Sequence, residues 1–228
     1  MFTLTPLEKS LQNYSNAFIS ILETFPMKQY TALDLSIGNT TLDNVDITNV
    51  EACQRYIDSI LEKNRAEVAY GGYLEQRNLY NGNAHFSASE DKRNNHLGVD
   101  FWAKAGTRVR VPLDGRLHSF RNNSTSGDYG PTIVLEHVLD GIIFHTLYGH
   151  LSVKSLHGLF VGRAYNKGDV LATLGTPDIN VNYAPHLHFQ IIQEMGEYQG
   201  DYPGVSTTKN LEFYANNCPN PNFLLKAT

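Results

Sequence analysis

The chain has 228 residues, which is enough for one sizeable hydrophobic core or for one domain with an appendage. Its content of 41% hydrophobic and 11% aromatic residues is typical of a globular protein and excludes a largely disordered one. A formal net charge of -5 argues against general nucleic-acid binding, so we expect no nucleic-acid partner.

The chain shows no sign of export or membrane insertion. Polar residues interrupt the first 26 positions, so they do not form the unbroken apolar core of a signal peptide. No apolar run reaches the roughly 18 residues that a membrane span needs. Cys53 and Cys218 are far apart and do not indicate a disulfide framework. The compartment therefore stays open: cytoplasmic as written, or periplasmic or extracellular if a leader has been removed.

The first expected element is a helix near the N-terminus. Thr5 can cap it, Pro6 suits the first helical position, and Glu8 completes a capping box. Apolar residues then recur at helical spacing from Leu7 to Phe25, and Pro26 would end the run. This pattern predicts a helix over most of the first 25 residues.

A second helix is predicted from Thr48 to about Lys63. It begins with another capping box, Thr48-x-x-Glu51, and carries an apolar stripe on one face. Between the two helices, residues 31–36 alternate enough to suggest a short strand. We therefore expect residues 1–65 to form a small helical appendage that packs on the main domain.

From Ala66 onward the segments become short and β-rich, with Gly, Asn and Asp between them. The clearest hairpin joins residues 132–137 to residues 142–148 through Asp140-Gly141, because an Asp-Gly pair between β-branched and aromatic runs favours a tight turn. A second hairpin is expected around Asp114-Gly115.

Further strands are predicted at residues 170–174 and 186–193. The whole pattern indicates a mainly β protein, α+β overall, with one compact antiparallel β domain over residues 66–200. An irregular tail rich in Asn and Pro is expected over residues 201–228.

Two histidines stand one residue apart in the last of these strands. Side chains at i and i+2 of a strand share a face, so His186 and His188 would project together while Leu187 and Phe189 face the core. Paired imidazoles suit a metal site, since neutral imidazole is the commonest biological metal ligand. The alternative is two solvent-facing histidines on an edge strand.

A second candidate pair is His96-x-x-x-Asp100. On a flat strand these residues would lie about 13 Å apart, too far to share one ion. If they do share one, the chain must bend between them, and Gly98 is the residue that would permit the bend.

The last candidate is His150, which follows Gly149 at the end of a predicted strand and could reach into a cleft. Each fragment alone also has an ordinary structural interpretation. The functional hypothesis rests on the occurrence of all three in one chain: His-x-x-x-Asp, a histidine at a strand end, and His-x-His. Most of the remaining histidines are given no role: His85, His118, His137, His145 and His157.

Three motifs in order resemble the M23 family of zinc metallopeptidases, the lysostaphin and LytM type. They are His96-x-x-x-Asp100, Tyr148-Gly149-His150-Leu151 and Pro185-His186-Leu187-His188-Phe189, with Gly106-Thr107 and Asp114-Gly115 between them. The resemblance covers about residues 92–193. It implies a compact antiparallel β domain with a groove and a zinc ion on the floor of that groove.

Carried over by position, the resemblance makes His96, Asp100 and His188 the ligands of one zinc ion. It makes His150 and His186 the catalytic histidines. Three protein ligands leave a fourth position for water, as in catalytic zinc sites. The chain has no His-Glu-x-x-His motif, so histidine must do the proton transfer. Which of the two histidines is the general base stays open.

Two segments depart from the family pattern. Residues 178–185, before the histidine pair, are bulkier and more polar than the glycine-rich turn often found there. The insert at residues 120–131 is expected to form a cleft wall, with Asp128 and Tyr129 favoured as turn residues. Residues 178–185 are expected to line the cleft differently and so to affect the choice of substrate.

The function favoured by the sequence is a zinc-dependent peptidase that hydrolyses peptide bonds, by resemblance those of bacterial cell-wall peptidoglycan. A non-hydrolytic binding or regulatory module on the same scaffold is the alternative, and the missing export signal favours it. The intact set of five site residues argues against it. A zinc hydrolase of another small amide or ester is a third option. The oligomeric state is not predicted.

Overall fold

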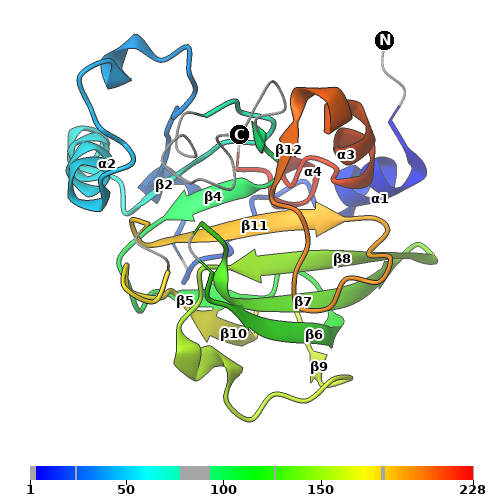
Figure 1. Ribbon diagram of the computed structural model, residues 1–228. Helices are drawn as coiled ribbons and strands as arrows, with labels where there is room; N and C mark the ends of the chain where they lie inside the picture. The colour runs from blue at the N-terminus through cyan, green and yellow to red at the C-terminus, as the bar shows by residue number, and fades with distance from the viewer. Residues whose placement is uncertain (1–3, 24, 78–92, 126, 181–182, 228) are drawn as a thin grey trace.

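The computed structural model describes residues 4–23, 25–77, 93–125, 127–180 and 183–227 (Figure 1). It confirms a mainly β protein built on one large sheet, with helices at the edges. Short 3-10 helices lie between the main elements at Met27–Gln29, Thr40–Leu42, Val153–Leu156 and Thr208–Asn210. Within the described ranges, every helix is too short or too polar to cross a membrane.

The large sheet has eight strands in the order β1-β2-β4-β11-β8-β7-β6-β9. All neighbours are antiparallel except β1 and β2, which pair in parallel, so the sheet is mixed. In sheet order the strands are β1 (Tyr30–Ala32), β2 (Val68–Gly71), β4 (Val99–Trp102), β11 (His186–Ile192), β8 (Ile142–Gly149), β7 (Gly130–Leu139), β6 (Gly115–Asn123) and β9 (Ala164–Tyr165).

Two smaller sheets complete the β structure. One pairs β5 (Arg108–Arg110) with β10 (Val170–Thr173), and the other pairs β3 (Arg93–His96) with β12 (Val205–Thr207).

Strand β11 lies in the middle of the large sheet, between β4 and β8 (Figure 1). Leu187 and Phe189 are fully buried in the main hydrophobic core. His186 and His188 project from the other face, as the alternation of side chains on a strand requires. The strand therefore separates a core face from a face that carries the candidate site.

The β7–β8 hairpin is confirmed. Its register pairs Leu139 with Ile142, which leaves Asp140 and Gly141 as the two turn residues. Both have positive φ, 51° and 79°, as a type I′ turn demands. This turn fixes the register of the hairpin whose second strand ends next to His150.

The hairpin expected at Asp114-Gly115 is wrong. Strand β5 pairs with β10, while Gly115 begins β6, which pairs with β7 and β9. A Cβ on Gly115 would lie 2.5 Å from Nδ1 of His137. That ring nitrogen donates a hydrogen bond to the Asp114 carbonyl at 2.8 Å. Position 115 must therefore be glycine because the His137 side chain packs against it. In the sequence, the same Asp-Gly pair looks like a turn.

The first helix, α1 (Pro6–Tyr14), begins as expected. Thr5 and Glu8 form both bonds of the capping box. The helix stops at Tyr14 and does not reach Phe25, because Ser15 is extended and its hydroxyl accepts a hydrogen bond from the Ala17 N–H.

Beyond this point the chain runs extended against the main domain. The Ile19 N–H donates to the Leu225 carbonyl at 2.8 Å, and Leu22 forms an isolated antiparallel bridge with Val109. The apolar residues after Tyr14 are therefore core contacts of an extended segment.

The second helix, α2 (Val50–Asn64), is confirmed, but its cap lies one residue later than expected. The Asn49 side chain accepts from the Ala52 N–H, while Thr48 bonds to Asp46 instead. The short strand expected at residues 31–36 is present only in part, as β1, which ends at Ala32. It adds an edge strand to the large sheet, so the first 65 residues are not purely helical.

The irregular tail expected after residue 200 is wrong. This segment holds β12 and two helices, α3 (Leu211–Asn217) and α4 (Asn222–Leu225). Its Asn and Thr side chains bond to nearby backbone: Thr207 caps a 3-10 helix, and the Asn220 side chain accepts from the Asn222 N–H. Leu224 and Leu225 enter the main core. The division of the chain near residues 65 and 200 stays a prediction.

Candidate metal centre and catalytic pocket

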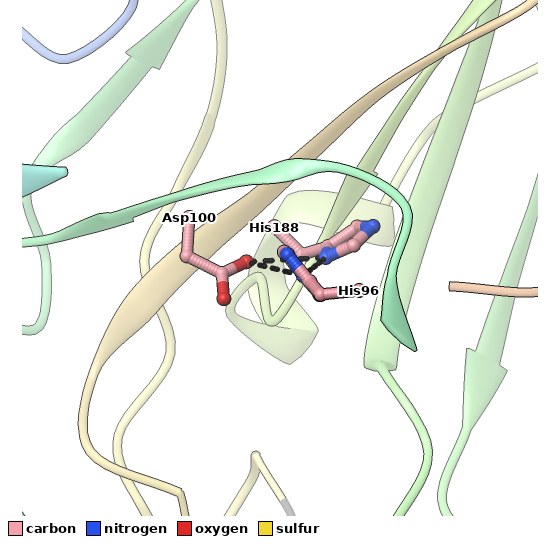
Figure 2. Close-up of side chains that lie close together, drawn as sticks. All are labelled: His96, Asp100 and His188. Carbon is pink, nitrogen blue, oxygen red and sulfur yellow. Dashed lines mark hydrogen bonds and ion pairs between the residues drawn. The ribbon is translucent and has the colours of Figure 1, made fainter. Parts of the chain in front are cut away.

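The side chains of His96 and Asp100, four residues apart, meet that of the distant His188 at one point (Figure 2). His96 ends β3, while Asp100 in β4 is the direct cross-strand partner of His188 in β11. Nε2 of His96 lies 3.2 Å from Oδ1 of Asp100, and Nδ1 of His188 lies 3.1 Å from the same oxygen. The two ring nitrogens are 2.9 Å apart.

This triangle of donor atoms fits a divalent metal ion. Ligand bonds of about 2 Å in a tetrahedral site place neighbouring ligand atoms about 3.3 Å apart. The side chains of His96, Asp100 and His188 are only 2–3% exposed. In the part of the chain that the structure describes, this is the one group of three or more His, Cys, Asp or Glu residues with donor atoms this close.

Outer hydrogen bonds orient both imidazoles. His96 Nδ1 lies 2.8 Å from the Gly72 carbonyl, which can only accept, so Nε2 of His96 keeps its lone pair. His188 Nε2 lies 2.9 Å from Oε1 of Gln190, whose amide nitrogen donates to the Pro203 carbonyl at 3.1 Å. His188 therefore turns the lone pair of Nδ1 toward Asp100. Metal-binding histidines commonly have such outer partners.

The charge states also suit a metal site. Burial lowers the pKa of His96 to about 4, which keeps the ring neutral. Burial alone would raise the pKa of Asp100, but the neighbouring His96 and Arg77 outweigh it and hold that pKa well below its usual value. A neutral imidazole and an ionised carboxylate are the forms that bind a metal.

Gly98 lies at the bend between β3 and β4, as the sequence suggested. The structure gives a second reason for glycine here. A Cβ at this position would lie 2.7 Å from Cε1 of His188 and 2.7 Å from the Phe189 carbonyl oxygen. Gly98 is thus needed because the His188 ring packs directly on the backbone.

His150 and His186 form a second histidine pair, with ring centroids 4.1 Å apart. Burial lowers the pKa of both rings. His186 Nδ1 donates to the Ala184 carbonyl at 2.7 Å, which leaves Nε2 as a proton acceptor. His150 has a φ of 60° and is held at its backbone, where its N–H donates to Tyr129 and its carbonyl accepts from Asn180.

All five predicted site residues line one pocket of about 660 Å³, namely His96, Asp100, His150, His186 and His188. The structure brings them together, while their roles as ligands and catalysts stay a prediction. Other parts of the pocket wall come from α2, which contributes Val50 and Cys53, and from the C-terminal segment, which contributes Tyr202 and Tyr214.

Asp128 has the expected turn contacts, although it also lines the pocket, whereas the expectation that Tyr129 is a turn residue is wrong. Asp128 Oδ1 accepts a hydrogen bond from the Tyr129 N–H. The Tyr129 ring is buried, lines the pocket and lies 4.9 Å from the His188 ring. An aromatic residue in an insert predicted to be a cleft wall was the signal that could have identified it.

Arg77 was also missed. Its Nη1 donates to Oδ2 of Asp100 at 2.5 Å, and its Nε donates to Glu75 at 2.5 Å. The guanidinium stands over the Trp102 ring, 5.5 Å from its centroid. No motif in the sequence marks this arginine, because its role depends on a contact with a residue 23 positions away.

The fold and the donor set define a β-sheet protein whose pocket holds a buried histidine-rich group able to bind a metal ion. Residues 94–200 match the model of Peptidase family M23. The resemblance seen in the sequence motifs is thereby confirmed over this segment, and the match supports a peptidase.

Among curated proteins, the chain is 33% identical over 96 residues to the DD-carboxypeptidase/endopeptidase Mpg of Neisseria meningitidis serogroup B and of Neisseria gonorrhoeae. The match covers 42% of this chain and 19% of each relative, so the chain spans about a fifth of their length.

Among solved structures, the catalytic domain of lysostaphin from Staphylococcus simulans is 25% identical. That match covers 53% of this chain and 80% of that one, with a TM-score of 0.38. A zinc-containing peptidase from Vibrio cholerae is 26% identical, with coverages of 43% and 27% and a TM-score of 0.35.

Proposed function

We propose that this protein is a zinc-dependent peptidase that cleaves peptide bonds in bacterial cell-wall peptidoglycan. The observation that carries the proposal is the triangle of donor atoms, 2.9–3.2 Å apart, in a pocket that also holds two neutral histidines. The match to Peptidase family M23 supports the reaction class. The Neisseria relatives are named as a DD-carboxypeptidase/endopeptidase, which supports this type of substrate.

In this proposal His96 Nε2, Asp100 Oδ1 and His188 Nδ1 hold the zinc ion. When bound, zinc would act as a Lewis acid on the scissile carbonyl and would make water a better nucleophile near neutral pH. The outer bonds from His96 to Gly72 and from His188 to Gln190 keep the two lone pairs directed inward.

His186 and His150 do the proton transfer in this proposal. His186 is assigned as the general base, because its bond to Ala184 leaves Nε2 as an acceptor facing the pocket. His150, whose ring lies against that of His186, would donate to the oxygen that gains negative charge as the carbonyl is attacked. Both rings are buried and neutral, so neither must lose a proton before the reaction.

The pocket has the size expected for a short peptide. Its volume of about 660 Å³ falls within the range of small-ligand sites, roughly 300–1,000 Å³. Its wall is part apolar, with Leu35, Ile47 and Trp102, and part phenolic, with Tyr198 and Tyr202. Such a lining suits a peptide that has both apolar and polar side chains.

The test combines metal content with digestion of defined muropeptides, read by mass spectrometry. We expect about one zinc per chain and cleavage of a peptide bond. His188→Ala should lose both zinc and cleavage while its circular dichroism spectrum is kept. His157→Ala, which changes an exposed histidine, is the control. A protein that binds no metal and cuts no muropeptide would overturn the proposal. Muropeptide binding without cleavage would instead support the non-hydrolytic module.

A further inference from the structure

We propose that the segment Gly72–Arg77 positions the metal ligands, with Arg77 as the positioning residue for Asp100 and Glu75 as the residue that orients Arg77. The inference rests on the proposed function, because it assumes that Asp100 is a ligand. The segment lies before residues 94–200, which match the peptidase family. The metal site would therefore depend on a part of the chain outside that match.

Arg77 binds one oxygen of Asp100 and leaves the other free to face the metal position. Nη1 of Arg77 lies 2.5 Å from Oδ2, while Oδ1 faces the ring nitrogens of His96 and His188 at 3.2 and 3.1 Å. A carboxylate held at one oxygen by a charged donor cannot rotate freely about its last bond. Oδ1 is thus already directed at the position where the metal would sit.

Arg77 is itself fixed from two sides. Its Nε donates to Oε2 of Glu75 at 2.5 Å, and the other oxygen of Glu75 accepts from the Leu35 N–H at 3.0 Å. The guanidinium also lies over Trp102, which belongs to the same strand as Asp100. The Arg77 side chain is 2% exposed and that of Glu75 is 11% exposed, so water competes little for these bonds.

The same segment reaches a second ligand through Gly72, whose carbonyl accepts from Nδ1 of His96. Gly72 has a φ of 103°, and a Cβ there would lie 1.9 Å from Nη2 of Arg77. Glycine is therefore required for the arginine to pass beside the turn. One short segment orients two of the three donor residues.

The charges explain why two residues are needed. A buried guanidinium next to a ligand carboxylate would weaken its attraction for a cation. Glu75 offsets that positive charge, so the pair Glu75–Arg77 adds orientation with little net charge. Removing Arg77 alone would leave the Glu75 carboxylate buried without this partner, which is costly. A neutral double variant is therefore the cleaner test.

The experiment measures zinc affinity of the full chain by chelator competition, together with the visible spectrum of the cobalt-loaded protein. The variants are Glu75→Gln with Arg77→Met, and Arg77→Lys, which keeps the charge but loses the fork of donors. We expect the zinc dissociation constant to rise about 10- to 100-fold in the double variant and less in Arg77→Lys. The cobalt spectrum should shift, because the ligand geometry changes.

Arg55→Met with Glu51→Gln is the matched control, since it removes an exposed Arg–Glu pair on α2. Variants that lower the unfolding temperature but keep the wild-type zinc affinity and cobalt spectrum would overturn the inference and leave only a structural ion pair. If the double variant does not fold, Arg77→Lys decides the question by the same two readouts. Failure of the wild-type protein to bind metal would instead overturn the proposed function.

Discussion

Gly98 shows how one residue can limit the geometry of a whole site. It lies in the bend that lets His96 and Asp100 approach each other, and it also forms the surface against which the His188 ring packs. Its φ is not in the left-handed region. The constraint is therefore the space beside the backbone.

We predict that Gly98→Ala moves the His188 ring. A Cβ would stand 2.7 Å from Cε1 of that ring, so either the ring or the strand must shift. We expect a loss of about 1–3 kcal/mol in the free energy of unfolding, as for overpacking in other cores, and weaker zinc binding. Urea unfolding of the metal-free protein and a zinc titration measure the two effects.

Gly38→Ala is the matched control, because a Cβ there meets only the Ser36 hydroxyl, at 3.7 Å. The prediction fails if the Gly98 variant matches this control in both stability and zinc affinity.

At the scale of elements, the strands that carry the site follow from the sequence. The alternation around His186 and His188 predicts β11, and Asp140-Gly141 predicts the β7–β8 hairpin. Both succeed because the period of two and the turn chemistry are local properties of the chain. The expected hairpin at Gly115 fails because that glycine makes room for a distant side chain.

Asn180 lies in the loop before β11 and is fully buried. Its amide nitrogen donates to the His150 carbonyl at 3.0 Å. His150 has a left-handed backbone, which costs a non-glycine residue roughly 1 kcal/mol or more and so needs support from its surroundings. This loop departs from the family pattern. Through Asn180 it contacts the backbone of His150, a proposed catalytic residue.

We predict that Asn180→Ala lowers kcat for muropeptide cleavage and leaves zinc affinity near that of the wild type. The reason is that Asn180 contacts His150, whereas the three proposed ligands come from β3, β4 and β11. We also expect a loss of about 0.5–1.5 kcal/mol in the free energy of unfolding, since one buried hydrogen bond is removed while the Gly175 N–H still donates to the His150 carbonyl. Steady-state kinetics and chelator competition separate the two properties.

Asn166→Ala, at an exposed position, serves as the comparison. An Asn180 variant with normal kcat, or one that loses zinc as strongly as activity, would contradict this role.

At the scale of the whole molecule, the pocket depends on contacts that the sequence does not reveal. The histidines and Asp100 could be identified because short motifs mark them. Arg77 carries no such mark and reaches the site only through the three-dimensional arrangement of the chain, whereas Tyr129 is marked only by its place in an insert expected to form a cleft wall. The same holds for the walls from α2 and the C-terminal segment, whose apolar residues look like ordinary core positions in the sequence.

The fold as a whole also buries histidines outside the pocket, and this predicts how stability depends on pH. His137 in β7 donates from Nδ1 to the Asp114 carbonyl and bonds through Nε2 to the Thr146 hydroxyl. Burial lowers its pKa to about 4. His145 in β8 is similar, with a pKa lowered to about 4 mainly by burial and then by His118.

We predict that the free energy of unfolding falls as the pH drops from about 6.5 to about 4. In this window the unfolded chain binds a proton on His137, which the folded protein does not, so acid favours the unfolded state. Above about 6.5 both states are neutral, and the contribution is constant. For His137 alone the expected loss between pH 7 and pH 5 is about 2 kcal/mol.

Urea unfolding at both pH values, with a chelator present, measures this loss without a contribution from metal release. His137→Asn should show a smaller loss between the two pH values than the wild type, because it removes one titrating group. His157→Asn, at an exposed position, should keep the wild-type slope. Equal slopes in all three proteins would mean that acid destabilisation comes from other groups and that His137 accepts its proton while folded.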